Sequence, residues 1–274
     1  MNEFVTKVRE KNLKKVVIDP VTRVEGHGKV TIITDEEGRI ERTRLHIVEF
    51  RGFERFIQGR PYWEAPVVVQ RLCGICPVSH HLAAAKAMDV VVGVGADGLS
   101  ATAEKMRRLM HYGQMLQSHA LHFFHLASPD LLFGFDSPVL KRNVLAVAAE
   151  HPELAKQGIN LRRFGQEVIR ATAGKKIHGT GAIPGGINRH LDPADRKQFL
   201  EEVDQMIDWS LGAVEIVKKL HGQNPDLFDS FGSFPSNHLS LVREDGALDF
   251  YHGVLRAVDD QGLKIYDGVN YDDY

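Results

Sequence analysis

The stretch Arg71-Leu72-Cys73-Gly74-Ile75-Cys76-Pro77-Val78-Ser79-His80 contains both cysteines of the 274-residue chain. The two cysteines are three residues apart, and a histidine follows four residues after the second. On a turn that contains glycine, two thiols at this spacing can point at one place in space. Such a pair is typical of a disulfide-redox site, of half a structural zinc site or of half a soft transition-metal site. Two unconnected buried thiols are the remaining interpretation, because free cysteine is commonly a small buried apolar residue.

The overall composition bounds the class of protein. With 43% apolar residues the chain can bury a sizeable core, and its length suits one large domain or two ordinary ones. A net charge of −2 without a clustered Lys/Arg stripe argues against nucleic acid as a partner. The aliphatic runs are too short for a membrane span, and residues 1–15 lack the apolar centre of a secretory signal. Together with only two cysteines, this predicts a reducing, cytoplasmic location.

The N-terminal part predicts a small antiparallel sheet. Residues 16–18 have the composition of a short strand. Residues 29–34 and 39–48 alternate apolar and polar positions around the turn Asp35-Glu36-Glu37-Gly38, which indicates a β-hairpin. A helix over residues 63–70 is then expected to lead into the cysteine loop.

Helices are expected to dominate the rest of the chain. Pro77 suits the first position of an Ala-rich helix that continues to Met88, and Ser100 suits the N-cap of a helix over residues 100–126. Further segments are predicted as helices at 137–150, 154–173 and 193–220, a turn-rich loop at 179–186, and strands at 230–234 and 239–242. The predicted fold class is therefore mainly α with a small N-terminal antiparallel β-hairpin or sheet, an α+β protein.

The segment Gly93-Val94-Gly95-Ala96-Asp97-Gly98 has the spacing of a dinucleotide fingerprint. That fingerprint requires a strand before it, a helix after it and an acid about twenty residues later. Here the preceding residues fit a helix better, and residues 115–121 contain no carboxylate. We interpret the segment as a loop between two helices.

Histidines follow one face of the helix expected at 100–126. His111, Ser118, His122 and His125 are separated by seven, four and three residues, so they share a face. The simplest interpretation is a polar seam between packed helices, in which each imidazole is bonded by a neighbour.

Three kinds of chemistry compete for the cysteine loop. For zinc, Cys73 and Cys76 with one or both of His80 and His81 supply three or four ligands, but one loop is tight for a tetrahedron. A thioredoxin-type redox pair follows a strand, whereas both flanks here fit helices. A nickel or iron site suits soft thiolates but needs further ligands from elsewhere.

The pattern Arg71-x-Cys73-Gly74-x-Cys76-x-x-x-His80 resembles the N-terminal metal-binding signature of the large subunit of [NiFe] hydrogenases. Other stretches agree with that family in order and spacing: Thr22-Arg23-Val24-Glu25-Gly26-His27, Phe50-Arg51-Gly52-Phe53-Glu54, His178 through Pro184-Gly185-Gly186, and the helix around His119, His122 and His125. Three wider phrases resemble most the cytoplasmic, NAD-reducing bidirectional group: Asp19 through His27, Trp63-Glu64-Ala65-Pro66, and Ser79-His80-His81-Leu82. The resemblance implies one large-subunit domain over residues 1–274 with a helical-bundle core.

The resemblance assigns roles within the cysteine loop. It implies that Cys73 is a terminal thiolate ligand of nickel and that Cys76 bridges nickel and an iron that carries diatomic ligands. It implies that His80 donates a hydrogen bond to a sulfur of the site. Arg71 lies beside the loop, where it either contacts the cofactor or forms a structural ion pair.

The resemblance also assigns roles to two carboxylates. It implies that Glu25 takes up the proton released at the metal, which requires a carboxyl group poised between its charged and neutral forms. It implies that Glu54 binds a Mg²⁺ ion as a hard oxygen ligand. Without the resemblance, Glu25 fits a turn or capping acid and Glu54 a solvated surface charge.

The implied reaction is the reversible heterolytic cleavage of dihydrogen. Electrons leave through iron–sulfur clusters, and this chain has no cysteines left to bind such clusters. The clusters are therefore expected in a small partner subunit, and the FMN and NAD sites in diaphorase subunits. The resemblance thus implies a multi-subunit H2:NAD+ oxidoreductase with protons and H2 as substrates.

One departure from the family concerns the second cysteine pair that completes the metal site near the family's C-terminus, because these 274 residues contain no such pair. We expect a truncated large subunit that is inactive alone and exposes helix faces meant for the missing part. The alternatives are a non-catalytic relative, such as the quinone-site subunit of respiratory complex I, a scaffold, and a small zinc-binding module.

Overall fold

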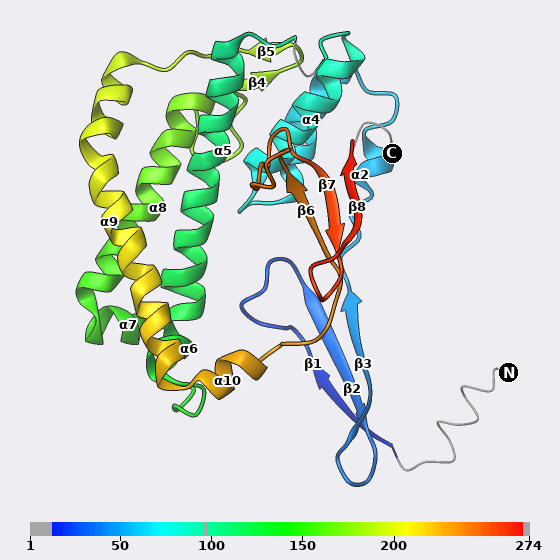
Figure 1. Cartoon of the computed structure of the whole chain (residues 1–274), viewed down its shortest axis with the longest axis vertical. Helices are drawn as coiled ribbons and strands as arrows, with labels where there is room; N and C mark the ends of the chain where they lie inside the picture. Colours follow the sequence, from blue (N-terminus) through cyan, green and yellow to red (C-terminus); the bar gives the residue numbers. More distant parts are fainter. Residues whose placement is uncertain (1–12, 96–97, 271–274) are drawn as a thin grey trace, which may run out of the picture. The chain divides into compact units, whose positions relative to one another are not determined.

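The computed structural model of the chain describes residues 13–95 and 98–270. It contains two compact units, Met1–Gln58 and Gly59–Tyr274 (Figure 1). Helices predominate and the sheets are small and antiparallel, so the predicted fold class is confirmed.

A three-stranded antiparallel sheet makes up most of the first unit. Its strands are β1 (Lys14–Ile18), β2 (Gly28–Thr34) and β3 (Ile40–Ile47), with β2 in the centre. The carboxylate of Asp35 closes the β2–β3 turn by accepting hydrogen bonds from the backbone N–H and Nε of Arg39, at 2.8 and 2.7 Å. Gly38 supplies the positive φ of +83° that this turn requires. The predicted strand and hairpin are therefore confirmed, and a short helix that was not predicted, α2 (Phe53–Phe56), follows them.

Three long helices form the body of the second unit: α5 (Ala101–Leu121), α8 (Pro152–Ala173) and α9 (Pro193–Gln223). They lie side by side in Figure 1, where α8 contacts both α5 and α9. The predicted N-cap of α5 is confirmed, because Oγ of Ser100 accepts a hydrogen bond from the backbone N–H of Ala103 at 3.2 Å. Apolar side chains fill the space between the helices, among them Ala120, Phe124, Leu161, Phe164, Val168, Phe199 and Met206.

Two glycines let α5 and α8 approach each other closely. A β-carbon on Gly165 would lie 2.5 Å from the backbone oxygen of Gly113, and one on Gly113 would lie 2.8 Å from the side chain of Val168. Since real β-carbons do not approach other atoms this closely, the crossing requires glycine on both helices.

Shorter elements complete the second unit. They are η1 (Tyr62–Glu64), α3 (Ala65–Val68), η2 (Val69–Leu72), α4 (Pro77–Val91), η3 (His122–Ala127), α6 (Ser128–Phe133), α7 (Val144–Glu150) and α10 (Pro225–Ser230). The hairpin of β4 (Ala182–Ile183) and β5 (Gly186–Ile187) lies in the predicted turn-rich loop. A second antiparallel sheet contains β6 (His238–Val242), β7 (Val254–Val258) and β8 (Lys264–Val269), with β7 in the centre.

Several helices differ in their bounds from the prediction, and a local contact or residue type explains most of these differences. The helix predicted at 63–70 is split into η1, α3 and η2, with Pro66 in the first turn of α3. The helix predicted at 137–150 begins only at Val144, because the side chain of Asn143 accepts hydrogen bonds from the next backbone N–H groups and caps α7 there. The helix predicted at 100–126 widens into the π-helical η3 at His122 and continues as α6.

The C-terminal predictions were partly wrong. The strand predicted at 239–242 is present as β6, but residues 230–234 form the end of α10 and a turn with Gly232 at a φ of +68°. Strands β7 and β8 were not predicted. The loop interpretation of the segment that starts at Gly93 agrees with the end of α4 at Val91, and residues 96 and 97 lie outside the described residues.

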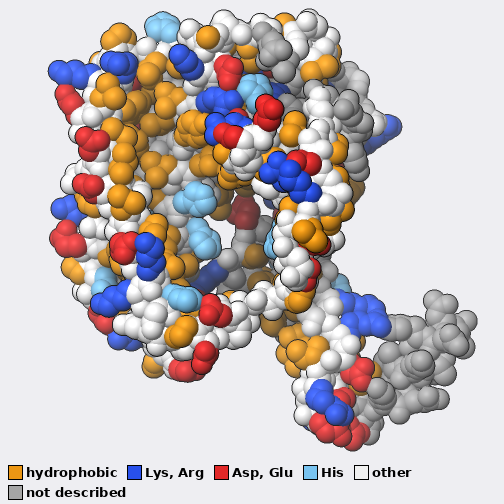
Figure 2. All heavy atoms as spheres, in the orientation of Figure 1, with side chains coloured by type: hydrophobic (Ala, Val, Ile, Leu, Met, Phe, Trp, Pro, Cys, Tyr) orange, Lys and Arg blue, Asp and Glu red, His pale blue; other side chains and the backbone are white. Residues whose placement is uncertain are grey.

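Helix α9 exposes an apolar stripe. Only Phe199 and Met206 are buried on this 31-residue helix, while the exposed hydrophobic side chains include Leu200, Ile207, Leu211, Val214 and Val217. Figure 2 shows hydrophobic side chains gathered over the helices of this unit. No helix within residues 13–95 and 98–270 is both long and apolar enough to cross a membrane.

Candidate metal centre

The two cysteines and His80 come together in the second unit. Their side-chain ligand atoms, the two Sγ atoms and an imidazole nitrogen, all lie within 4.8 Å of one another. We call these three residues the Cys–His group. Cys73 is buried, Cys76 is half-buried, and both are present as thiols rather than as a disulfide.

Two helical segments position the group. Cys73 follows η2 in extended backbone conformation (φ −142°, ψ 138°), and Cys76 occupies the N-cap position of α4. Pro77 is the first helical residue, as predicted, because its fixed φ suits a helix start and the missing N–H is not needed there. His80 is one turn further along α4, so its side chain lies on the same side as the cysteines.

Backbone N–H groups surround the Cys73 sulfur. Its Sγ accepts hydrogen bonds from the backbone N–H of Cys76 at 3.1 Å and of Ile75 at 3.3 Å. These two donors hold the Cys73 sulfur at a fixed position, next to the side chains of Cys76 and His80.

Two glutamines on α5 form hydrogen bonds with the backbone of the cysteine loop and of the first turn of α4. Oε1 of Gln114 accepts hydrogen bonds from the backbone N–H groups of Val78 at 2.7 Å and Ser79 at 3.3 Å, so it caps the first turn of α4. Nε2 of Gln117 donates to the carbonyl oxygen of Ile75 at 3.0 Å. Sequence reasoning missed both residues, and their spacing of three on one helix face was the available signal.

His81 is not available as a metal ligand, although the zinc interpretation included it. Nδ1 donates to the carbonyl oxygen of Pro66 at 2.7 Å, and Nε2 accepts from the backbone N–H of Ala182 at 3.0 Å. Burial lowers the pKa of this imidazole, which is 1% exposed. Both ring nitrogens are thus used, and the Cys–His group offers three ligands where a structural zinc site requires four.

Arg71 contacts a distant part of the chain. Its Nη1 lies 3.0 Å from Nδ1 of His178, and Nε2 of His178 lies 3.3 Å from the carbonyl oxygen of Cys73. The structural ion pair considered for Arg71 is replaced by a hydrogen bond to a histidine. His178 carried no assigned role in the sequence, although it begins one of the stretches shared with the hydrogenase family.

The two carboxylates with predicted roles lie in the first unit. Glu25 is exposed in the bend between β1 and β2, next to Gly26 at a φ of +82°. Glu54 is exposed in the first turn of α2, which follows Gly52 at a φ of +61°. Within the described parts of the chain, the Cys–His group is the one place where three or more His, Cys, Asp or Glu ligand atoms meet. The roles of Glu25 in proton transfer and of Glu54 in Mg²⁺ binding stay predictions.

The histidines of the predicted polar seam have different environments. Nε2 of His111 lies 3.4 Å from Oγ of Ser79, and burial lowers the pKa of His111. Burial also lowers the pKa of His125, which is half-buried. His122 is exposed where the helix widens into η3, so the seam prediction was right for His111 and wrong for His122.

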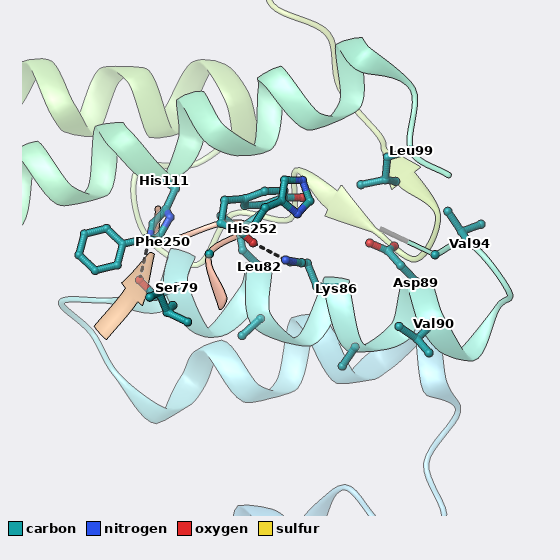
Figure 3. Close-up of a pocket in the computed structure, with 16 residues that line it drawn as sticks. Ser79, Leu82, Lys86, Asp89, Val90, Val94, Leu99, His111, Phe250 and His252 are labelled. Carbon is teal, nitrogen blue, oxygen red and sulfur yellow. Dashed lines mark hydrogen bonds between the residues drawn. The ribbon is translucent and has the colours of Figure 1, made fainter. Parts of the chain in front are cut away.

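A separate cavity of about 580 Å³ lies between α4, α5 and residues 250–253. Figure 3 shows Leu82 and Val90 among its apolar lining, with His111, His252 and Lys86 on the polar side. Lys86 donates a hydrogen bond to the carbonyl oxygen of Tyr251. No member of the Cys–His group lines this cavity.

Sequence comparisons agree with these features. Residues 51–136 match the protein family described as nickel-dependent hydrogenase, and residues 15–50 match a family described as HoxL-like. The chain is 48% identical over 270 residues to the NAD-reducing hydrogenase HoxS subunit beta of Cupriavidus necator, covering 95% of this chain and 55% of the relative. It is 43% identical to a subunit of the F420-non-reducing hydrogenase of Methanothermobacter marburgensis, covering 90% and 52%. The chain therefore spans about half the length of these relatives.

Solved structures of hydrogenases have the same fold. A crystal structure of an NAD+-reducing [NiFe]-hydrogenase in the H2-reduced state matches with a TM-score of 0.92 and 57% identity, covering 95% of this chain and 57% of that one. The Ni-Fe-Se hydrogenase of D. vulgaris Hildenborough matches with a TM-score of 0.75 and 25% identity, covering 93% and 55%. Together with the Cys–His group, these similarities show that the chain belongs to the nickel-dependent hydrogenase large-subunit family.

Proposed function

We propose that the chain supplies the N-terminal cysteine pair of the nickel–iron centre in an NAD-reducing hydrogenase. The observation that carries the proposal is the Cys–His group, in which two thiols and an imidazole lie within 4.8 Å of one another on the loop that opens α4. Its sequence lies inside the matched hydrogenase region, residues 51–136. The similarity to HoxS subunit beta supports NAD+ as the electron acceptor.

The chemistry of the donor set fits such a centre. Thiolates are soft ligands that select nickel, iron and similar metals over hard cations. The Cys73 sulfur accepts hydrogen bonds from two backbone N–H groups, and neither cysteine is used in a disulfide. The two cysteines leave room for ligands from outside the described residues. When bound, the centre supplies the heterolytic cleavage of dihydrogen.

The residues of this chain have distinct proposed tasks around that centre. Cys73 and Cys76 bind the metals, and His80 donates a hydrogen bond to a sulfur, which lowers its basicity. Arg71 lies at the rim of the loop, where its contact with His178 fixes the guanidinium. Glu25 accepts a proton and passes it on, a general-base role to which a carboxylate is suited. Glu54 binds Mg²⁺ through its carboxylate oxygens.

Electron transfer requires partner subunits in this proposal. Both cysteines of these 274 residues belong to the Cys–His group. From the similarity to a subunit of an NAD-reducing hydrogenase, we assign the clusters to a small subunit, and FMN and NAD to diaphorase subunits. Because the NAD pool is intracellular, the proposed complex works in the cytoplasm.

The test is a metal and activity measurement on the complex as purified from its source. We expect nickel and iron near one each per large subunit, beyond the iron of the clusters, and H2-dependent reduction of NAD+. Purification of the chain with zinc alone would contradict the nickel–iron proposal and favour the zinc-binding alternative. Nickel and iron with H2 oxidation but without NAD+ reduction would keep the hydrogenase and exclude NAD+ as its acceptor.

A further inference from the structure

His178 joins the cysteine loop to a segment more than 100 residues away in the sequence. An arginine side chain can only donate hydrogen bonds, so Nδ1 of His178 must accept from Nη1 of Arg71, 3.0 Å away. The hydrogen of the neutral ring is then on Nε2, which donates to the carbonyl oxygen of Cys73 at 3.3 Å. Both contacts therefore require the same tautomer, and they fix the ring between the residues on either side of Leu72.

The backbone at His178 is held in an uncommon conformation. Its φ is +54°, in the left-handed region that non-glycine residues seldom occupy. The next residues explain why it persists. A β-carbon on Gly179 or Gly181 would collide with Ala173 or Thr172 at the end of α8, and the backbone N–H of Thr180 donates to the carbonyl oxygen of Ala173 at 3.0 Å. The glycines thus let this segment lie directly on α8.

Buried polar side chains fix the other end of the same segment. The backbone N–H of Ala182 donates to Nε2 of His81, and the backbone N–H of Gly185 donates to Oδ1 of Asp89 at 2.7 Å. Arg107 donates to the carbonyl oxygens of Ile183 and Gly186 at 2.8 and 2.9 Å. The support for His178 is therefore rigid, since its anchors are buried and lie on α4 and α5.

The contact to Cys73 has a direct consequence for its thiol. The carbonyl of Cys73 belongs to the peptide bond with Gly74, which starts the turn that aims the backbone N–H groups of Ile75 and Cys76 at the Cys73 sulfur. Fixing that carbonyl fixes the orientation of the turn. We infer that His178 is a positioning residue for the Cys73 sulfur, held against the loop by residues 179–186. This inference rests on the proposed role of the Cys–His group as a metal site.

The inference can be tested with Co²⁺ alone as the probe, on the full chain. Cobalt bound by thiolates gives a thiolate-to-cobalt charge-transfer absorption band, whose intensity in a titration reports affinity. We expect His178→Ala to weaken Co²⁺ binding by about tenfold or more, the usual loss when a residue that orients a metal ligand is removed. His178→Gln keeps an amide N–H that reaches the Cys73 carbonyl and should restore part of the affinity. The matched control is His190→Ala, because His190 is an exposed histidine in the connection between β5 and α9.

Circular dichroism before each titration checks that the variants are folded. If His178→Ala does not fold, Arg71→Met tests the same contact, since it removes the donor to Nδ1 without changing the left-handed backbone; it should weaken the band as well. Equal Co²⁺ affinity and identical bands for His178→Ala and the unsubstituted chain would overturn the positioning role while leaving the metal site intact. Absence of the band from the unsubstituted chain would overturn the metal site and the positioning role together.

Discussion

Asp89 and Arg107 form a buried ion pair that joins α4 to α5. Nη1 and Nη2 of Arg107 donate to the two carboxylate oxygens of Asp89 at 2.6 and 3.1 Å, and the two residues are 4% and 0% exposed, respectively. The same guanidinium bonds the β4–β5 hairpin through its carbonyl oxygens. Burial opposes the charge of Arg107, but hydrogen bonds to Asp89 and Tyr251 outweigh it and raise the pKa of the guanidinium.

Removing one partner of this pair should be strongly destabilising. Arg107→Met leaves the Asp89 carboxylate buried without its counter-charge, which typically costs about 3–5 kcal/mol of unfolding free energy. Chemical denaturation monitored by circular dichroism measures the loss. Arg163→Met is the control, since Arg163 pairs with Glu202 at the surface, where such a pair contributes about 1 kcal/mol or less. Equal losses of unfolding free energy for the two variants would show that the buried Asp89–Arg107 pair contributes no more to stability than a surface pair.

Replacing glycine by alanine on two different helices should change the stability of the fold in opposite directions. Gly165→Ala places a methyl group against the backbone oxygen of Gly113 at the α5–α8 crossing and should cost about 1–3 kcal/mol through overpacking. Gly212→Ala lies on exposed α9 with no atom within 4 Å of the new methyl group, and should stabilise by up to about 1 kcal/mol because alanine favours helix. Thermal unfolding of both variants is the measurement. A stabilising Gly165→Ala would mean that the helices do not cross this closely.

Acid stability should depend on Asp249. Burial alone would raise the pKa of its carboxyl group, but hydrogen bonds from Arg108 and from the backbone N–H groups of Tyr251 and His252 lower it to about 2 from the usual 3.8. The side chain is 10% exposed. A depressed pKa stabilises the fold at any pH above about 4, and this contribution, about 2 kcal/mol, is lost as the pH falls from about 4 to 2.

The measurement is the unfolding free energy of Asp249→Asn between pH 2 and 7. The variant should be less stable than the unsubstituted chain at pH 7 and should approach it near pH 2, as Asp249 becomes protonated in both states. Asp260→Asn, at an exposed turn position, is the control. A stability difference that is the same at pH 2 and pH 7 would contradict an origin in the Asp249 charge.

Serine at either cysteine should abolish tight binding of soft metals. Cys73→Ser and Cys76→Ser each replace a soft thiolate by a hydroxyl that is not ionised at neutral pH. The nickel content of the complex should then fall close to background, as measured by elemental analysis. Ser79→Ala, on the same first turn of α4 but outside the Cys–His group, should keep its nickel. Normal nickel content in Cys73→Ser would remove that residue from the proposed site.

A carboxylate at position 25 should matter for catalysis rather than for assembly. Glu25→Gln has nearly the same shape but cannot take up a proton, so the proposed relay predicts a loss of H2 oxidation of about a hundredfold or more, the usual contribution of a general base. Nickel content should stay unchanged. Glu36→Gln, in the β2–β3 turn of the same unit, is the control and should retain activity. Full activity of Glu25→Gln would show that a residue other than Glu25 takes up the proton.

Much of the local structure follows from short-range chemistry. The turn at Asp35–Gly38, the cap at Ser100 and the start of α4 at Pro77 were predicted because each depends on one residue and its immediate neighbours. The predictions failed where a competing local contact was overlooked. Asn143 caps α7 and shortens the helix predicted at 137–150.

The family, the mainly helical class and the two cysteines proposed to bind metal follow from the amino-acid sequence alone. Residue types at fixed spacing carry that information, because Cys-x-x-Cys followed by histidine brings its ligands together within a single loop and helical turn. Which neighbours support the cysteines depends on how the chain packs. Both ring nitrogens of His81 form hydrogen bonds with the backbone of Pro66 and Ala182, so His81 does not bind metal. His178, from another segment of the chain, donates a hydrogen bond to the Cys73 carbonyl oxygen. Such contacts depend on how α4, α5, α8 and the β4–β5 hairpin pack, and packing over a hundred residues leaves no periodic signal in the sequence.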